Sequence, residues 1–281
     1  MSIIEDLKSR YKKGNIVEKL IYINVAVFFS TFIFQLFQGS ANEINLLVNW
    51  FSLDDDVNSL LKKPWSIISY GFLHADFLHI LMNLLVLYYI GNLFLEYFTQ
   101  KQLLTFYILG TFFGGVLYIF SQNYFPLFEG KSSLLVGASA GISAIFIGIA
   151  TYIPNYQLKL RFIGFVKLWH LAAIWIGLDV IGLIGANAGG NFAHLGGALF
   201  GFLYVNKASN TEINLFDKLS SFFKRKKKSP LKTVHKSKVK KKTNTNLNQQ
   251  QIDAILDKIS KSGYDTLTKA EKEFLFKQGK K

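Results

Sequence analysis

A small set of polar residues lies within otherwise apolar stretches of this 281-residue chain. Such side chains are costly in apolar surroundings and usually face a bundle interior or a water-filled cavity, so they are the first candidates for chemistry. The clearest pattern is G-x-S-x-G around Ser139, from Gly137 to Gly141. The whole set comprises Asn24, Gln35, His79, Asn83, Glu96, Ser139, Ser143, His170, Asp179, Asn191 and His194.

The residue types in this set fit acyl transfer. A serine hydroxyl is a weak nucleophile until a base removes its proton, and a neutral histidine such as His194 can take that proton and deliver it to a leaving amine. The developing oxyanion needs donors, for which the Asn83 amide, His79 and the Ser139 backbone N–H have suitable chemistry. Taken alone, the G-x-S-x-G pattern also fits small residues that pack helices, because no strand precedes it as in soluble α/β-hydrolases.

Six apolar runs must position these residues. A membrane-spanning helix needs about 20 mostly apolar residues. The runs are 20–37, 72–98, 103–120, 139–153, 166–184 and 192–205. The fourth and sixth are short and follow the Gly-containing polar segments 131–137 and 185–191. Non-helical backbone at membrane depth is tolerated only where protein buries it or water fills a cavity, so we expect these two helices to begin at a wet cleft.

The composition indicates a membrane-embedded region followed by a basic tail. Half of the residues are hydrophobic and 18% are charged, whereas soluble domains carry about a quarter of charged residues. Residues 1–205 hold 12 Lys and Arg against 11 Asp and Glu, and residues 206–281 hold 20 against 7. Basic residues favour the cytoplasmic side, and placing both termini there assigns 29 of the 32 to it. We expect a multi-pass protein of a bacterial inner membrane with both termini cytoplasmic.

Depth along the predicted helices brings the reactive residues together. At about 1.5 Å rise per residue, Ser139 and Asn83 lie roughly 22 Å, and His194 roughly 18 Å, from the cytoplasmic ends of their helices. His79 lies one turn beyond Asn83 on the same face, because residues i and i+4 share a face. Four polar side chains are therefore expected to meet in one layer.

Glycine spacing predicts which helices touch at that layer. Gly197 and Gly201 are four residues apart, a small-residue stripe that lets a neighbouring backbone approach closely. Gly137 and Gly141 offer a matching small surface beside Ser139. The fourth and sixth helices are therefore expected to pack where the serine must meet the histidine.

The chain is predicted to have four parts, which are a cytoplasmic segment 1–19, a membrane domain 20–205, a basic disordered linker 206–247 and a small cytoplasmic helical hairpin 248–281. The linker is rich in Ser, Thr and Asn and has Lys clusters within 224–228 and 240–242. Such a composition favours disorder, and Lys clusters near a membrane attract anionic lipid. Nucleic acid is the less favoured partner. The hairpin is predicted from apolar residues at helical spacing and from Thr268 and Glu271, placed as a capping box.

Three motifs in this order resemble the rhomboid family of intramembrane serine proteases. They are Phe72-Leu73-His74 with His79-Ile80-Leu81-Met82-Asn83, then Gly137-Ala138-Ser139, then Ala193-His194-Leu195-Gly196-Gly197 with Gly201. The resemblance covers about residues 16–205. It implies a six-transmembrane-helix, rhomboid-like bundle that hydrolyses peptide bonds in or near transmembrane segments of other membrane proteins. It also implies that Ser139 is the nucleophile, that His194 is the base, that His79 and Asn83 line the oxyanion site, and that His74 is a structural loop residue.

Two positions depart from the family pattern. Trp65 is followed by Ser66 where the family often has Trp-Arg. Ser143 lies one turn after Ser139, where the family often has an aromatic residue stacked on the base. Neither departure removes a reacting group, so they bear on substrate range and on the orientation of the imidazole.

Other functions remain open at this stage. A protease-inactive relative could bind transmembrane helices without needing an intact Ser139 and His194, and a channel or transporter could use His79, His194 and Asp179 as a relay. Asp179 is the spare intramembrane carboxylate on the outer helices, and we interpret it as structural rather than as a third catalytic residue. The chain has no Cys, which excludes thiolate metal sites and cysteine nucleophiles. We expect neither a metal nor a cofactor.

Overall fold

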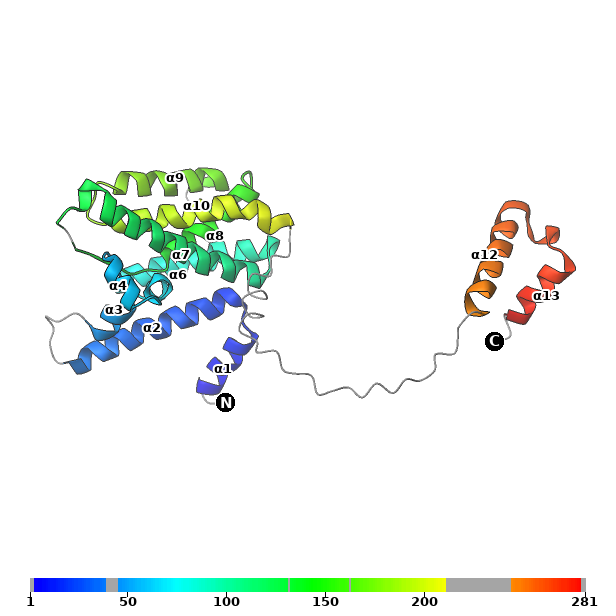
Figure 1. Ribbon diagram of the computed structural model, residues 1–281, viewed down its shortest axis with the longest axis horizontal. Helices are drawn as coiled ribbons and strands as arrows, with labels where there is room; N and C mark the ends of the chain where they lie inside the picture. The colour runs from blue at the N-terminus through cyan, green and yellow to red at the C-terminus, as the bar shows by residue number, and fades with distance from the viewer. Residues whose placement is uncertain (1–2, 39–44, 131, 162, 211–243, 279–281) are drawn as a thin grey trace. The chain divides into compact units, whose positions relative to one another are not determined.

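The computed structural model describes residues 3–38, 45–130, 132–161, 163–210 and 244–278 (Figure 1). The chain divides into two compact units, Met1–Arg225 and Lys226–Lys281, which are described separately. Most of the predicted linker 206–247, including its two Lys clusters, lies outside the described residues.

Helices dominate the first unit. Its α-helices are α1 Ile3–Lys13, α2 Ile16–Gln38, α3 Leu46–Phe51, α4 Val57–Lys62, α5 Ser66–Ser69, α6 Phe77–Tyr97, α7 Gln100–Tyr124, α8 Ser139–Tyr152, α9 Leu168–Gly182 and α10 Ala188–Asn210. Its shorter elements are η1 Tyr70–Phe72, η2 Pro126–Phe128, and the strands β1 Leu53–Asp54, β2 Leu134–Leu135, β3 Gln157–Leu160 and β4 Gly164–Lys167.

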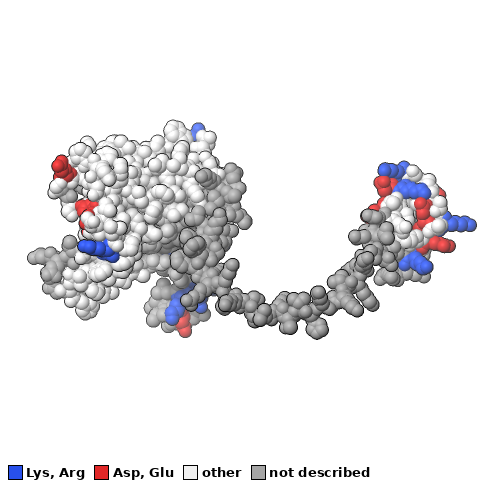
Figure 2. All heavy atoms as spheres, in the orientation of Figure 1, with Lys and Arg blue, Asp and Glu red and all other residues white. Residues whose placement is uncertain are grey.

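The first unit has the surface and the helices of a membrane protein. Within the described residues, α2, α6 and α7 are long and apolar enough to cross a membrane, and α8 and α9 are shorter apolar helices. Figure 2 shows a face of this unit on which Lys, Arg, Asp and Glu are sparse. Large apolar side chains such as Phe77 and Leu178 are 68% and 63% exposed. Exposed apolar surface of this kind is suited to lipid, so the unit is a mostly helical membrane bundle.

Helix α8 lies at the centre of the bundle. Eleven of its 14 residues are buried, and it packs against α6, α7 and α10. Its contact with α10 is close, because Cβ atoms added at Gly197 and Gly201 would lie 2.0 and 2.2 Å from the carbonyl oxygens of Ala140 and Ala144. Only glycine leaves room for this approach of the two backbones.

The residues of α8 that contact α10 are not the ones that the sequence predicted. Gly141 faces α7, where an added Cβ would lie 2.7 Å from the carbonyl oxygen of Tyr107. Gly137 precedes α8 with φ of +131° and lies beside His79. The surface opposite the glycine pair of α10 is formed instead by Ala140 and Ala144. Neighbouring residues in a helix point about 100° apart, so α8 presents separate small faces to α7 and α10.

Helix α10 is longer than predicted. The sequence placed its start at 192 after a non-helical segment, but the helix begins at Ala188 and ends at Asn210. The carbonyl of Asn187 accepts the N–H of Asn191 at 3.1 Å, and Asn is a favoured residue at helix starts. Gly189 lies in the first turn of α10. Its missing side chain leaves room for Gln122, whose Nε2 would lie 2.7 Å from a Cβ added at Gly189. Close packing thus overrides the low helix propensity of glycine.

The all-α prediction also missed two short antiparallel ladders, β1 with β2 and β3 with β4. The β3–β4 hairpin takes the place of the expected start of the fifth helix at 166, so α9 begins at Leu168. Gln157–Leu160 alternates polar and apolar residues, which is typical of a strand. Gly164, with φ of +93°, lies where the hairpin turns back.

The loop between α2 and α6 holds the segment that leads into α8. β1 pairs with β2, and the Asp55 carboxylate accepts the N–H of Ser133 at 2.7 Å. The Gly137 N–H donates to the carbonyl of Tyr70 at 3.0 Å. The position of Ser139, two residues further on, is therefore determined by this loop as well as by the helix.

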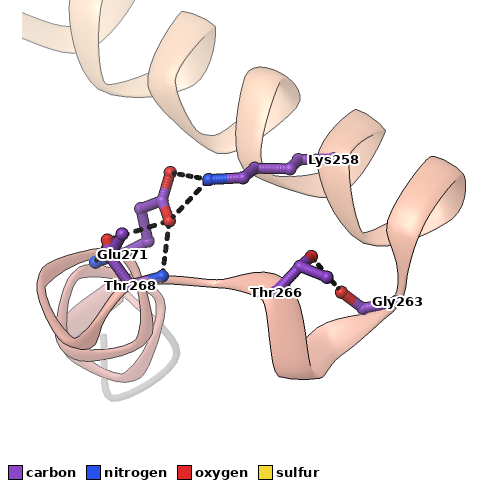
Figure 3. Close-up of polar contacts among 5 residues, drawn as sticks. All are labelled: Lys258, Gly263, Thr266, Thr268 and Glu271. Carbon is purple, nitrogen blue, oxygen red and sulfur yellow. Dashed lines mark hydrogen bonds and ion pairs between the residues drawn. The ribbon is translucent and has the colours of Figure 1, made fainter.

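The second unit contains α12 Asn244–Ser262, η3 Tyr264–Thr266 and α13 Lys269–Gln278. Ile255 and Leu267 are its buried apolar residues. The capping box predicted at Thr268 and Glu271 is present, since the Glu271 carboxylate accepts the Thr268 N–H at 2.7 Å (Figure 3). The same carboxylate binds Lys258 of α12 at 2.9 and 3.0 Å. One side chain thus both caps α13 and links it to α12.

The stability of the α13 cap is expected to depend on pH. Hydrogen bonds from the Thr268 backbone and the Lys258 side chain hold the pKa of Glu271 at about 2, below its ordinary value of 4.5. Since the folded pKa is lowered, the stabilisation is complete above about 4.5 and is lost as the pH falls toward about 2. In the full chain, the NMR shift of the Thr268 amide should titrate near pH 2, and Glu271→Gln should remove the transition. A midpoint near 4.5 would contradict the prediction.

Candidate active site

Ser139 and His194 are in hydrogen-bonding contact. The Oγ atom of Ser139 lies 2.6 Å from Nε2 of His194. Ser139 is the first residue of α8, and His194 lies in the second turn of α10. His194 lies about one turn before Gly197, where α10 packs closely against α8. A hydroxyl at this distance from a neutral imidazole nitrogen can lose its proton to it.

Asp179 of α9 contacts the other side of the same imidazole. Its Oδ1 atom lies 2.7 Å from Nδ1 of His194, and the residue is 6% exposed. An ionised carboxylate can only accept, so Nδ1 carries the proton and Nε2 is left to accept from Ser139. The sequence favoured a structural role for Asp179 over a catalytic one, and the structure places its carboxylate in direct contact with His194.

Trp175 also reaches the site from α9, and sequence reasoning did not single it out. Its Nε1 donates to Oγ of Ser143 at 3.0 Å, and its ring centroid lies 6.5 Å from that of His194 at an interplanar angle of 37°. The aromatic side chain missing at Ser143 is thus supplied by a neighbouring helix. The signal was the i, i+4 spacing of Trp175 and Asp179, which places both on one face of α9.

His79 borders the space in front of the serine. Its Nδ1 accepts a long hydrogen bond of 3.5 Å from the Ala75 N–H, an arrangement that leaves the ring proton on Nε2. A Cβ added at Gly137 would lie 2.8 Å from this Nε2 and 3.5 Å from Oγ of Ser139. Glycine therefore keeps open the space between a hydrogen-bond donor and the nucleophile.

Asn83 and the start of α8 supply further donors. Asn83 lies one turn after His79 and donates one amide proton to the His79 carbonyl at 2.9 Å, which leaves its second amide proton available. Helix α8 begins after Ala138 without a side-chain cap. The first N–H groups of a helix have no intrahelical acceptor, so the backbone amides at Ser139 and Ala140 are available to an anion in front of them.

Ser139, His194, His79 and Asn83 line a cavity of about 1050 Å³. Its polar lining comprises Asp76, His79, Asn83, Gln122, Ser132, Ser133, Ser139, Asn187 and His194. Gly185 and Asn187, both exposed, lie at its border, so the cavity communicates with the surface. Within the described part of the chain, no cluster of three or more His, Asp or Glu residues is arranged to hold a metal.

His74 lies behind this cavity, in the loop between η1 and α6. Its ring is buried and contacts the ring of His79 edge-on, with centroids 5.1 Å apart. His74 therefore packs against His79 from outside the cavity lining.

Comparison with known families places this arrangement in context. A family model described as Rhomboid domain matches residues 61–210, just over half of the chain, and includes all the residues of the site. A second model, described as a family of unknown function (DUF6576), matches residues 238–281.

Several curated proteins are similar to the chain. Presenilin-associated rhomboid-like protein A, mitochondrial, of Danio rerio is 31% identical over 139 residues, which cover 48% of this chain and 35% of that protein. RHOMBOID-like protein 4 of Arabidopsis thaliana is 31% identical over 152 residues, 53% of this chain and 35% of that protein. Presenilin-associated rhomboid-like protein, mitochondrial, of Homo sapiens is 30% identical over 163 residues, 57% of this chain and 41% of that protein.

The chain thus spans well under half the length of these relatives. The family model covers the helices that bear Ser139, His194, His79 and Asn83. The chain belongs to the rhomboid family.

Proposed function

We propose that this chain is an intramembrane serine endopeptidase that cuts peptide bonds in or near transmembrane segments of membrane proteins. The observation that carries the proposal is the 2.6 Å contact between Oγ of Ser139 and Nε2 of His194, at the wall of a cavity in an apolar helical bundle. No metal or cofactor is required by this chemistry.

The reaction uses groups already in contact. His194 takes the hydroxyl proton on Nε2 while Oγ of Ser139 attacks the peptide carbonyl carbon, and the C–N bond then breaks as the same proton passes to the leaving amine. The oxyanion lies toward His79, Asn83 and the first backbone amides of α8, and one such donor is typically worth about 10²–10³ in rate. A water molecule from the cavity then hydrolyses the acyl-enzyme by the reverse proton path.

A protease-inactive protein that binds transmembrane helices is the alternative. It would have no use for a nucleophile and a base held in direct contact, and that contact favours the protease. The bacterial inner membrane expected from the sequence gains no support from relatives whose names include the word mitochondrial. The proposal therefore specifies a membrane and membrane-protein substrates, without a compartment.

For the topology, we propose that α2, α6, α7, α8, α9 and α10 all cross the bilayer with both termini on one side. The membrane domain 20–205 is then followed along the chain by an accessory hairpin, 248–281. Helix α8 has 14 residues and α9 has 15, which is short of the roughly 20 needed, so α8 begins within the membrane at the cavity.

The chain has no native Cys, so introduced cysteines report cleanly. Cysteine at Leu61 should react with an impermeant reagent from outside intact cells and cysteine at Lys159 should not, and the reverse would refute the topology.

The function is tested with a serine-directed fluorophosphonate on the purified full chain in detergent. We expect one labelled residue, Ser139, because its hydroxyl is paired with an imidazole nitrogen. Ser30→Ala is the matched control, since that hydroxyl donates to a carbonyl of its own helix and its removal should leave labelling unchanged. A native chain that neither reacts with the probe nor cleaves a panel of transmembrane segments would refute the proposal.

A further inference from the structure

We propose that Asp179 is a positioning residue for His194, so that the chain works with a Ser-His-Asp triad rather than the Ser-His pair that the rhomboid resemblance implies. This inference rests on the proposed protease function and refines its mechanism. The third group comes from α9, whereas the nucleophile and the base come from α8 and α10.

Within the part of the chain that the structure describes, Asp179 is a buried carboxylate with one hydrogen-bond partner, His194. Its Oδ1 atom binds Nδ1 of His194 at 2.7 Å, and its Oδ2 atom is buried without a hydrogen-bond partner among the described residues. A buried carboxylate is costly unless it is paired. The hydrogen bond to the imidazole is therefore the interaction that offsets the cost of burying this carboxylate.

Few residues of α9 are fully buried. Within this described helix, only Leu168 and Asp179 are buried. Trp175, one turn before Asp179, lies near the imidazole and is held by its bond to Ser143. Two side chains on one face of α9 thus hold His194, one through a hydrogen bond and one by packing. This face fills the role of the aromatic residue that is missing at Ser143.

The chemical consequence concerns the tautomer and the charge of the base. With Nδ1–H bonded to Asp179, the lone pair of Nε2 faces Ser139, which is the form able to take a proton. When that proton arrives, the imidazolium is stabilised by the carboxylate, which stays ionised throughout. No further proton donor or acceptor is needed, and the proton on Nε2 leaves with the amine.

The test is Asp179→Asn in the full chain, assayed on a transmembrane substrate in detergent. By comparison with serine hydrolases that lose their acidic residue, we expect kcat to fall by about 10²–10⁴-fold. KM should change by less than about 3-fold, because Asp179 does not touch substrate. Nitrogen-15 NMR of labelled histidine gives a readout independent of turnover. We expect His194 to be protonated on Nδ1 in the native chain and in Ser139→Ala. In Asp179→Asn we expect a mixture of the Nδ1–H and Nε2–H tautomers.

Two variants separate a positioning role from a structural one. Leu178→Ala removes a neighbouring side chain that is 63% exposed and should keep native activity. Asp179→Glu keeps the carboxylate but displaces it, so its kcat should lie between those of Asp179→Asn and the native chain. If Asp179→Asn does not fold, the kinetic comparison is made with Asp179→Glu alone. Native kcat in a folded Asp179→Asn, or in an Asp179→Glu whose His194 is no longer protonated on Nδ1, would overturn the inference and leave the Ser139–His194 protease standing. A native chain without protease activity would refute the proposed function and the inference with it.

Discussion

Alanine at Ser139 or at His194 is expected to abolish cleavage of a transmembrane substrate while the helical bundle stays folded. In the proposed mechanism, Ser139 provides the atom that bonds to the carbonyl carbon, and His194 provides the nitrogen, 2.6 Å away, that takes its proton. In serine hydrolases, losing either group costs on the order of 10⁶-fold in kcat. Turnover by either variant should therefore fall below detection, as measured by gel-based cleavage in detergent.

The double variant distinguishes a joint role from two separate ones. Because the two side chains act as one unit, Ser139→Ala with His194→Ala should be no slower than either single variant. Asn83→Ala is the graded comparison, since His79 and backbone amides remain as donors, and its activity should be reduced but measurable. Ser139→Ala that cleaves as fast as the native chain would show that the mechanism is wrong, whatever family the chain belongs to.

Gly201→Ala is expected to destabilise the bundle strongly. The added Cβ would lie 2.2 Å from the carbonyl oxygen of Ala144, a backbone atom that cannot move without shifting α8. Overpacking of this kind typically costs about 1–3 kcal/mol, occasionally more. Thermal unfolding in detergent should show a clear fall in midpoint temperature, with some loss of activity as α8 is displaced from α10.

The matched control is Gly177→Ala on α9, where an added Cβ meets nothing within 4 Å. Alanine is a better helix former than glycine by roughly 0.5–1 kcal/mol. This variant should therefore unfold at the native temperature or slightly above it. Equal effects of the two substitutions would show that the close approach of α8 and α10 does not carry stability.

Local regularities made the core of the site predictable. The rise of a helix is fixed, so counting residues from the helix ends placed Ser139, His79, Asn83 and His194 at one depth, and all four line one cavity. The small-residue stripe at Gly197 and Gly201 predicted a close helix contact for the same reason, because its spacing follows from helix geometry.

What could not be predicted depends on how separate elements turn toward each other. The pairing of Asp179 with His194 requires the rotation of α9 about its axis, and no local pattern determines that rotation. The face of α8 that meets α10 was misassigned for the same reason, since Ala140 and Gly141 are both small and differ only in direction. The β3–β4 hairpin was missed because the alternating run 157–160 is only four residues long, and the end of β4 was counted in the apolar run 166–184.

The uncapped start of α8 has a further consequence for any attempt to stabilise this protein. Supplying a capping side chain at a helix start commonly adds about 1 kcal/mol. At Ala138 such a side chain would occupy the backbone amides that face the cavity. A capping residue at this position would thus stabilise the helix and impair the proposed protease activity, a trade-off between stability and activity at a single residue. Selection for heat resistance and selection for turnover would act in opposite directions at this position.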